Sequence, residues 1–350
     1  MLSLTSSSPR RSGLRRGLLA VAAGLLAVAV SGCGQSSTGD QTSSQSPAAD
    51  QTSAGGSAVA GPGSSGAGPA TGPVTVDTAA GPLTLPAPAT KVAVLQFQFL
   101  DMLLSLGVQP TMVADEQVAG SASPMPVQFE GKLGTYKSLG SRLAPNLEVL
   151  ASDPVDLILV DKGEHLKDRD QFETYAPTAV LDTWGWSEFY PNLEKLGKLV
   201  GKPDQAAKVA AEVKDHFASG AQKLANLKGA KAMVAVATKD KFFSFTGNSL
   251  QAGVMTDLGM GYAYKNVEGV LTEQVPLESL AAAAPDVLFL AVDKGTPMVT
   301  DTWKGNALWD SIPAVKNGKV FVMDRGIWSL GRGPMAVDLM IDQTVEKLAP

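Results

Sequence analysis

Residues 203–228 have the sequence PDQAAKVAAEVKDHFASGAQKLANLK. Apolar residues recur there at steps of three and four, which places them in one stripe along an α-helix. These residues are Ala206, Val209, Ala210, Val213, Phe217, Ala221 and Leu224. Pro203 suits the first turn of a helix and Gly229 suits the position just after its end. We predict a helix over 203–228, roughly 35–40 Å long at about 1.5 Å per residue.

The chain before this helix is repeated after it. Residues 147–151 (LEVLA) match 277–281 (LESLA), and residues 156–160 (DLILV) match 286–290 (DVLFL), each 130 residues further on. The repeat keeps the spacing between a helix-like segment and the strand-like segment that follows. We therefore predict two similar lobes joined by a rod.

The composition is that of a globular protein with room for two domains. The chain has 350 residues, of which 44% are hydrophobic and 18% are charged. A net charge of −5 argues against a nucleic-acid partner, because such binders usually carry a basic face. Cys33 is the only cysteine, so the folded part has no disulfide and no thiolate site for zinc.

The N-terminus is typical of a secreted lipoprotein. Arginines precede a short apolar run over residues 17–30, and the run is too short to be a confident membrane span. The sequence Val-Ser-Gly-Cys at 30–33 resembles the bacterial lipobox, which implies cleavage before Cys33 and lipidation of its thiol. The alternative is an ordinary secretory signal with an incidental cysteine.

We expect a signal peptide over residues 1–32 and a disordered tether over 33–72. The tether is rich in Ser, Gly and Pro, and from Gly34 on its only charged residues are Asp40 and Asp50. Such a composition buries too little apolar surface to offset the entropy lost on ordering.

Strand-like and helix-like segments alternate on both sides of the long helix, which indicates parallel sheets covered by helices. In the N-terminal lobe, residues 73–202, the predicted strands are 92–95, 111–114, 157–160 and 179–181. In the C-terminal lobe, residues 229–350, they are 232–237, 242–246, 287–291 and 319–323. The fold class is therefore α/β.

Ligands of open parallel sheets bind in loops beyond the carboxyl ends of the strands. In the N-terminal lobe these loops carry Phe97, Arg142, Lys162, Trp184 and Trp186. Arginine offers a planar fork for carboxylates, and tryptophan offers a flat apolar wall. The alternatives are that Phe97 belongs to the core and that Lys162 is a solvated loop charge.

Two further candidates follow the last predicted strand of the C-terminal lobe. Trp328 and Arg332 lie in the sequence WSLGRGP, ahead of a helix predicted over 335–348. Backbone N–H groups at a helix start favour anions, which suggests a role for Arg332 in binding. Gly-Arg-Gly-Pro could also be turn chemistry alone.

With these residues in place, the chain resembles the periplasmic-type solute-binding lipoproteins of iron–siderophore ABC importers, and within them the ferric dicitrate type. The likeness covers residues from about 91 to the C-terminus. It rests on KVAVL at 91–95, DMLLSLGV at 101–108, LGSR at 139–142 with PNLE at 145–148, PDVLF at 285–289, and WSLGRGP at 328–334.

The resemblance implies two Rossmann-like lobes joined by one rigid helix, with the ligand in the cleft between them. It also implies that a glutamate on each lobe docks on arginines of a membrane permease, and the matching positions are Glu148 and Glu278. The blander explanation is that the helix dipole favours glutamate in a first turn, and both can hold. The expected setting is a monomer, lipid-anchored on the outer face of a bacterial cytoplasmic membrane and served by a permease and its ATPase.

The expected cargo is a ferric complex of an anionic chelator, held by Arg142 and Arg332. The aromatic residues expected to pack against its organic frame are Phe97, Trp184, Trp186 and Trp328. Iron would stay in the chelator's own oxygen shell, so no cofactor and no metal ligands from the protein are expected.

Two other readings of the sequence stay open. The same fold could bind cobalamin or haem, although His165 lies in a charged loop where we expect it to be solvated. An enzyme on an α/β scaffold is disfavoured, because the sequence has no nucleophile elbow, phosphate loop or His-Glu-x-x-His motif.

Overall fold

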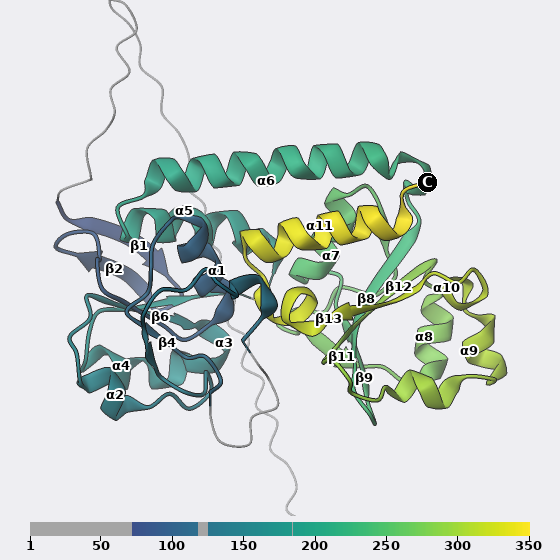
Figure 1. Cartoon of the computed structure of the whole chain (residues 1–350), viewed down its shortest axis with the longest axis horizontal. Coiled ribbons are helices and arrows are strands. Elements are labelled where there is room, and N and C mark those ends of the chain that lie inside the picture. The colour runs from purple at the N-terminus through teal and green to yellow at the C-terminus, as the bar shows by residue number, and fades with distance from the viewer. Residues whose placement is uncertain (1–71, 118–124, 184) are drawn as a thin grey trace, which may run out of the picture. The chain divides into compact units, whose positions relative to one another are not determined.

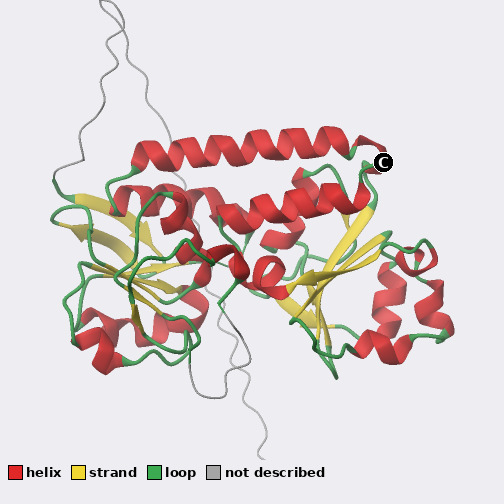
Figure 2. Ribbon diagram, viewed as in Figure 1, coloured by secondary structure: helices red, strands yellow, loops and turns green. Residues whose placement is uncertain are grey.

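Two sheets and one long helix dominate the computed structural model, which describes residues 72–117, 125–183 and 185–350 (Figures 1 and 2). The predicted signal peptide, Cys33, nearly all of the predicted tether and Trp184 lie outside these residues. None of the helices in the described ranges has the length and apolar character that a membrane span requires.

The N-terminal sheet is fully parallel, with strand order β5-β4-β3-β6-β7. Its strands are β3 (Val92–Val94), β4 (Met112–Val113), β5 (Lys137–Ser138), β6 (Leu157–Asp161) and β7 (Thr178–Leu181). Every residue of β3 and β6 is buried, as expected for strands covered by helices on both faces. The helices of this lobe are α1 (Phe97–Ser105), α2 (Leu147–Ala151), α3 (Lys162–His165), α4 (Arg169–Glu173) and α5 (Phe189–Leu199). A separate hairpin of β1 (Val74–Thr78) and β2 (Gly81–Leu85) precedes them.

The C-terminal sheet has the order β11-β9-β8-β12-β13, with β10 also paired to β8. Its strands are β8 (Lys231–Ala237), β9 (Phe242–Phe245), β10 (Gly261–Tyr262), β11 (Thr272–Gln274), β12 (Val287–Val292) and β13 (Val320–Asp324). The pairs among β8, β10, β12 and β13 are parallel, whereas β9 runs antiparallel to β8 and β11. The physical reason is the connection from β8 to β9, a short turn closed by Thr238 and Lys241, whereas a parallel crossover needs a dozen residues or more.

Helices cover the C-terminal sheet and close the chain. They are α7 (Leu250–Asp257), α8 (Leu277–Ala283), α9 (Ala307–Ser311), α10 (Pro313–Lys316) and α11 (Pro334–Leu348). Single turns of 3-10 helix occur at η1 (Val127–Phe129), η2 (Leu166–Asp168), η3 (Trp186–Glu188), η4 (Ala225–Leu227) and η5 (Val299–Trp303), and η6 (Gly326–Gly331) is a π-helix.

The predicted rod is α6 (Pro203–Lys223), which runs along both sheets in Figure 1. It ends earlier than predicted, because residues after Leu224 tighten into η4. The half-buried His216 bridges to α11, with Nδ1 2.8 Å from Asp338 and Nε2 3.0 Å from Asp342. Burial lowers the pKa of His216, but the hydrogen bonds to the two carboxylates outweigh this effect and raise it. The helix is thus fixed to the end of the chain as well as to both lobes.

The sequence repeat is also a structural repeat. The paired segments form α2 and α8, then β6 and β12. Asp156 accepts a hydrogen bond from the Lys91 N–H at 2.8 Å, and Asp286 accepts the equivalent bond from the Lys231 N–H at 2.8 Å. Each aspartate also donates its own N–H to the carbonyl of the same lysine. The repeated aspartate therefore fixes the start of the neighbouring strand in both lobes.

Trp186 joins the two lobes beside the long helix. Its ring stacks on Phe189 at 4.9 Å and meets the edge of Phe217 at 5.5 Å. Its indole N–H donates to Asp257 of α7 at 3.1 Å. Gly253 of α7 lies against the same ring, and a Cβ built there would be 2.0 Å from Trp186 Cγ. The close approach of η3 to α7 therefore requires glycine at position 253.

We expect Gly253→Ala to lower the free energy of unfolding by about 1–3 kcal/mol, because the methyl group overpacks the indole. Helix propensity alone predicts that the same change raises the free energy of unfolding by about 1 kcal/mol. The sign of the measured change therefore separates overpacking from helix propensity. Denaturant unfolding measures it. Gly134→Ala is the control, since the nearest atom to a Cβ there is 3.5 Å away. A variant at 253 as stable as the wild type would contradict the packing.

Candidate ligand-binding site

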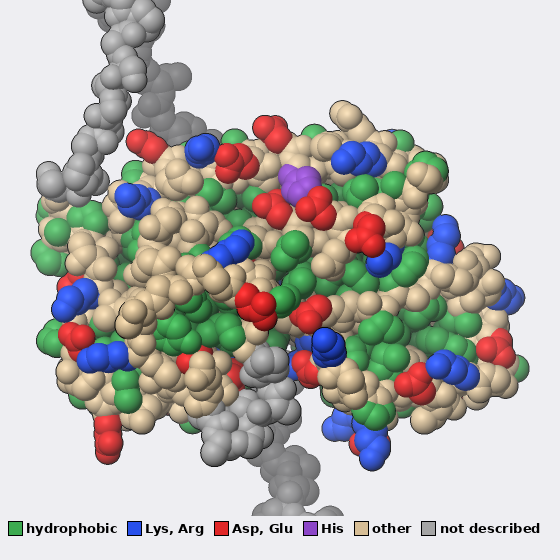
Figure 3. Space-filling view, viewed as in Figure 1, with side chains coloured by type: hydrophobic (Ala, Val, Ile, Leu, Met, Phe, Trp, Pro, Cys, Tyr) green, Lys and Arg blue, Asp and Glu red, His purple; other side chains and the backbone are tan. Residues whose placement is uncertain are grey.

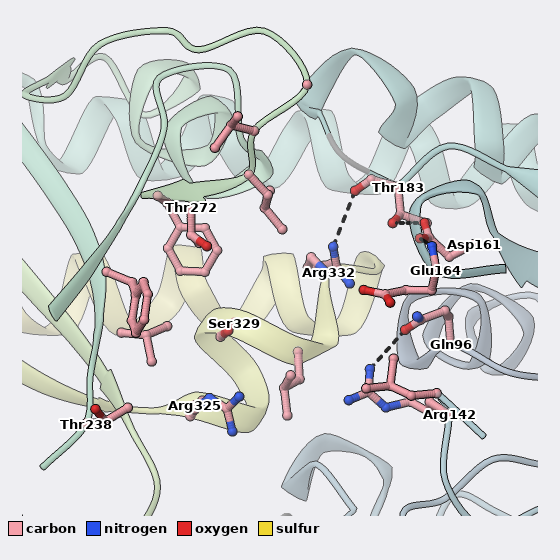
Figure 4. A pocket seen from close by; sticks show the side chains of 18 residues that line it. Gln96, Arg142, Asp161, Glu164, Thr183, Thr238, Thr272, Arg325, Ser329 and Arg332 are labelled. Atoms are coloured by element: carbon pink, nitrogen blue, oxygen red, sulfur yellow. Dashed lines mark hydrogen bonds between the residues drawn. The ribbon is translucent and has the colours of Figure 1, made fainter. Parts of the chain in front are cut away.

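A cavity of about 610 Å³ lies between the two lobes (Figure 4). This volume is typical of small-molecule sites. The polar residues that line it are Gln96, Arg142, Asp161, Glu164, Thr183, Thr238, Thr272, Arg325, Ser329 and Arg332. The larger apolar residues are Leu143, Val236, Phe243, Phe245, Val270, Leu271 and Leu330.

Strand ends position much of this lining. Gln96 follows β3 at the start of α1, Asp161 ends β6, and Thr183 lies two residues beyond β7. Arg325 directly follows β13 in the other sheet. The carboxyl ends of parallel strands thus meet at the cavity from both lobes, as the rule for open sheets predicts.

Arg142 is held on three sides. Glu116, at a positive φ of 61°, accepts hydrogen bonds from the Arg142 backbone N–H at 2.9 Å and from Nε at 2.8 Å. Nη1 donates to Gln96 Oε1 at 3.0 Å, and the guanidinium carbon lies 4.6 Å from the centre of the Phe97 ring. Burial lowers the pKa of Arg142, and the ion pair with Glu116 opposes that effect. An arginine in this setting keeps its charge, so the group presents a fixed cation to the cavity.

Arg332 is the most buried of the cavity's guanidinium groups, with 9% of its surface exposed. Its Nη1 donates weakly to the Thr183 carbonyl across the lobes, at 3.5 Å. Within the described ranges its Nε has no hydrogen-bond partner and its side chain forms no ion pair. Burial lowers its pKa, with Asp161 acting in the opposite direction. A buried cation with unused donors is costly, and an anion in the cavity would offset that cost.

Arg325 also lines the cavity, and the sequence analysis missed it. Its Nη1 lies 3.2 Å from Asp293, and its Nε is buried without a partner in the described part of the chain. Two signals could have found it. Arg325 lies two residues beyond the predicted strand 319–323, and Asp293 occupies the loop that repeats the Asp161 loop of the first lobe.

Trp328 does not line the cavity, which corrects the prediction for this residue. It lies in η6, between Arg325 and Arg332, and is fully buried. Its ring stacks on Phe289 at 4.6 Å and its indole N–H donates to Gln343 at 2.6 Å. Both the apolar and the polar part of the side chain are therefore satisfied inside the C-terminal lobe. The π-helix turns the indole into the core and leaves an arginine at each end beside the cavity.

Three further predicted residues, Phe97, Trp186 and Lys162, also lie off the cavity wall. Phe97 is buried beneath Arg142 and packs on Phe129 at 5.9 Å, so it supports the site from the core. Trp186 serves the contact between the lobes described above. Lys162 pairs with Asp182 at 2.9 Å and lines a neighbouring hollow of about 490 Å³. Its side chain is 46% exposed, in agreement with the alternative of a solvated charge.

His165 is not solvated, contrary to expectation. It is 1% exposed, with Phe172 against its ring. Its Nε2 lies 2.7 Å from the Arg142 carbonyl, and the Asp161 N–H donates to its Nδ1 at 3.3 Å. A carbonyl only accepts and an amide N–H only donates, so these partners select the neutral tautomer protonated on Nε2. His165 therefore ties the Arg142 loop to the end of β6.

Asp101 holds the segment that follows Arg332. Its buried carboxylate, on α1 of the N-terminal lobe, accepts hydrogen bonds from the N–H groups of Met335 at 2.8 Å and Ala336 at 3.1 Å. Gly333 lies so close that an added Cβ would be 2.4 Å from Asp101 Cβ. Burial raises the pKa of Asp101 to about 7, against the lowering effect of these two hydrogen bonds. This contact fixes the start of α11, and with it the loop of Arg332, against the opposite lobe.

The two glutamates predicted to dock on a permease lie at the surface, away from the cavity. Glu148 and Glu278 are exposed in the first turns of α2 and α8, at equivalent positions of the two lobes, and neither lines the cavity. Their contact with a permease stays a prediction.

Across the described ranges, no three His, Cys, Asp or Glu side chains are grouped so as to hold a metal ion.

Comparison with known proteins identifies the class. Residues 92–325 match the family described as Periplasmic binding protein, and the chain belongs to this family. It is 30% identical to the Fe(3+)-citrate-binding protein YfmC of Bacillus subtilis (strain 168), over 77% of this chain and 84% of that protein. It is 25% identical to the Fe(3+) dicitrate-binding periplasmic protein FecB of Escherichia coli (strain K12), over 78% of this chain and 89% of that protein.

A solved structure has the same fold. Staphylococcus aureus SirA complexed with staphyloferrin B superimposes with a TM-score of 0.68 at 25% identity, covering 78% of this chain and 98% of that chain. The two-lobed α/β architecture with one long helix is therefore that of the family.

We expect the stability of the protein to depend on pH through Asp101. Its pKa of about 7 in the fold lies above the ordinary value of 3.8, so its contribution is full below about pH 4 and is lost as the pH rises through 7. The loss could reach about 4 kcal/mol. Asp101→Asn should remove this dependence, so urea unfolding at about pH 4.5 and about pH 8 should show the variant gaining stability relative to wild type. A difference that does not change with pH would contradict this origin.

Proposed function

We propose that the cavity binds the ferric complex of an anionic, citrate-like chelator. The observation that carries the proposal is the convergence of Arg142, Arg325 and Arg332 from two lobes on one cavity. Guanidinium groups match carboxylate oxygens in geometry and charge. The two Fe(3+)-citrate-binding relatives support a carboxylate chelator.

The protein is a solute-binding protein of an ABC importer for ferric siderophores, and it is not an enzyme. Such a protein works outside the cytoplasm and delivers its cargo to a permease with an ATPase. On the face shown in Figure 3, Lys and Arg side chains alternate with Asp and Glu side chains instead of forming a continuous basic patch. This surface agrees with a partner other than nucleic acid.

The iron would enter and leave inside the chelate. Its coordination by the chelator's oxygens would explain a cavity whose lining residues include neither histidine nor cysteine. The role of the protein is then to hold the outer oxygens of the complex. We expect no cofactor beyond this cargo.

Cobalamin or haem is not favoured as the cargo. Both ring nitrogens of His165 are engaged by backbone groups, and His216 bridges α6 to α11. Neither imidazole is placed to give an axial bond to a metal in the cavity. YfmC and FecB are described as binding Fe(3+)-citrate and Fe(3+) dicitrate.

The remaining proposals concern how the protein is placed and recognised. A signal peptide over 1–32 and lipidation at Cys33 would anchor the chain on the outer face of the cytoplasmic membrane, with 33–72 as tether. Homologues named as lipoproteins support this arrangement. The N-terminal lobe, 73–202, and the C-terminal lobe, 229–350, would act as one monomer joined by the helix region 203–228.

We expect Arg332→Gln to weaken the binding of ferric citrate about 10- to 100-fold, which corresponds to the loss of one or two charge-assisted hydrogen bonds. Isothermal titration calorimetry measures the affinity. The control is Arg169→Gln, which removes a surface arginine paired with Glu173, away from the cavity. Unchanged affinity in the Arg332 variant would count against the proposed function.

We expect the double reversal Glu148→Arg and Glu278→Arg to abolish uptake of the iron chelate by cells, because it places cations against the arginines expected on the permease. Ligand binding by the purified protein should not change. Asp170→Arg with Asp310→Arg is a matched control, since both are exposed first-turn acids, one in each lobe. Loss of uptake in the control as well would show a general charge effect instead of docking.

A further inference from the structure

Four carboxylates lie at or beside the cavity, although its proposed cargo is an anion. They belong to Glu116, Asp161, Glu164 and Asp293. Arg142 is paired with Glu116 and Arg325 with Asp293, so each of these cations has its own counter-ion. Asp161 accepts hydrogen bonds from the Thr183 hydroxyl and from the Glu164 N–H at 3.1 Å. Three of the four carboxylates are thus satisfied within the protein.

Glu164 is the exception. Its side chain is exposed and, in the described ranges, takes part in no hydrogen bond or ion pair. Figure 4 shows it reaching into the cavity from α3, toward Arg332 and Arg142. It acts electrostatically on both guanidinium groups, although it pairs with neither within 4.0 Å.

An anion bound by Arg332 would therefore have a second anion for a neighbour. At separations of several ångströms, two like charges near a protein surface repel by an amount that changes affinity several-fold per unit of charge. The opposing guanidinium groups attract the cargo, while Glu164 offsets part of that attraction. Two carboxylates at Glu116 and Asp293 are neutralised by their partners and contribute less.

We propose that Glu164 is a charge-selecting residue, whose free carboxylate opposes the negative charge of the cargo and so limits how anionic a bound chelate can be. This inference rests on the proposed function and adds to it the class of chelate preferred, one of low net negative charge. A carboxylate at this point costs affinity for every anion and costs most for the most highly charged ones. Selectivity then comes from a repulsive element as well as from the arginines.

The test compares Glu164→Gln with wild type by isothermal titration calorimetry, using ferric citrate and iron-free citrate as probes. Removing the charge should tighten binding about three- to tenfold at low salt. The gain should shrink between about 20 mM and about 500 mM NaCl, because salt screens an exposed charge. Glu164→Ala should behave in the same way, since it also removes the charge. Glu130→Gln is the control, an exposed glutamate of the same lobe that does not line this cavity, and it should change affinity less than twofold.

The outcomes separate the two proposals. If wild type binds ferric citrate and both Glu164 variants bind it equally or more weakly, the inference is overturned and the proposed function stands. If wild type fails to bind ferric citrate but binds citrate, the proposed function fails and the response of the variants to citrate decides the role of Glu164. Tightening in Gln with weakening in Ala would still support the inference, because Gln removes the charge and keeps the hydrogen-bonding atoms of the side chain, whereas Ala also removes those atoms. A wild type that binds neither probe overturns both.

Discussion

The burial of Arg332 where the two lobes meet is the constraint on which the rest of the structure depends. A guanidinium with 9% of its surface exposed and no carboxylate paired to it within the described residues raises the free energy of the empty fold. The protein keeps it there because packing and hydrogen bonds on either side fix its loop. In the function proposed above, the same unsatisfied charge binds the ligand, so the free-energy cost of the empty state and the affinity for the ligand would have one origin.

Three contacts outside the cavity hold the two lobes and the long helix together around Arg332. Trp186 fills the space between η3 and α7, Asp101 caps α11 from the opposite lobe, and His216 joins α6 to α11. Asp101 is buried and His216 is half-buried, and each forms hydrogen bonds with α11, a helix far from both residues in the sequence. The lobes are therefore connected through their packed helices as well as through the chain, which suits a cavity whose walls come from both sides.

Within the site, the two lobes contribute equivalent loops whose aspartates make different contacts. Asp161 and Asp293 occupy equivalent loops, yet the first is bonded to Thr183 and the second is paired with Arg325. The π-helix η6 follows β13, whereas β7, the strand at the same place of the N-terminal sheet, is followed by the 3-10 turn η3. The C-terminal lobe thus brings Arg325 and Arg332 to the cavity, and the N-terminal lobe brings Arg142 together with Glu164.

The sequence alone determined the long helix, the repeated helix–strand units and the arginines at the strand ends, because these depend on local periodicity and on chain direction. The same rule would have included Arg325 had it been applied to the last strand. Only the tertiary structure decided that Trp328 and Phe97 belong to the core, that His165 is buried, and that β9 turns back antiparallel. It also decided that Glu164 has no ion-pair partner among the residues described. Whether a side chain is buried or paired depends on residues that lie far away in the sequence, so a local sequence pattern does not predict it.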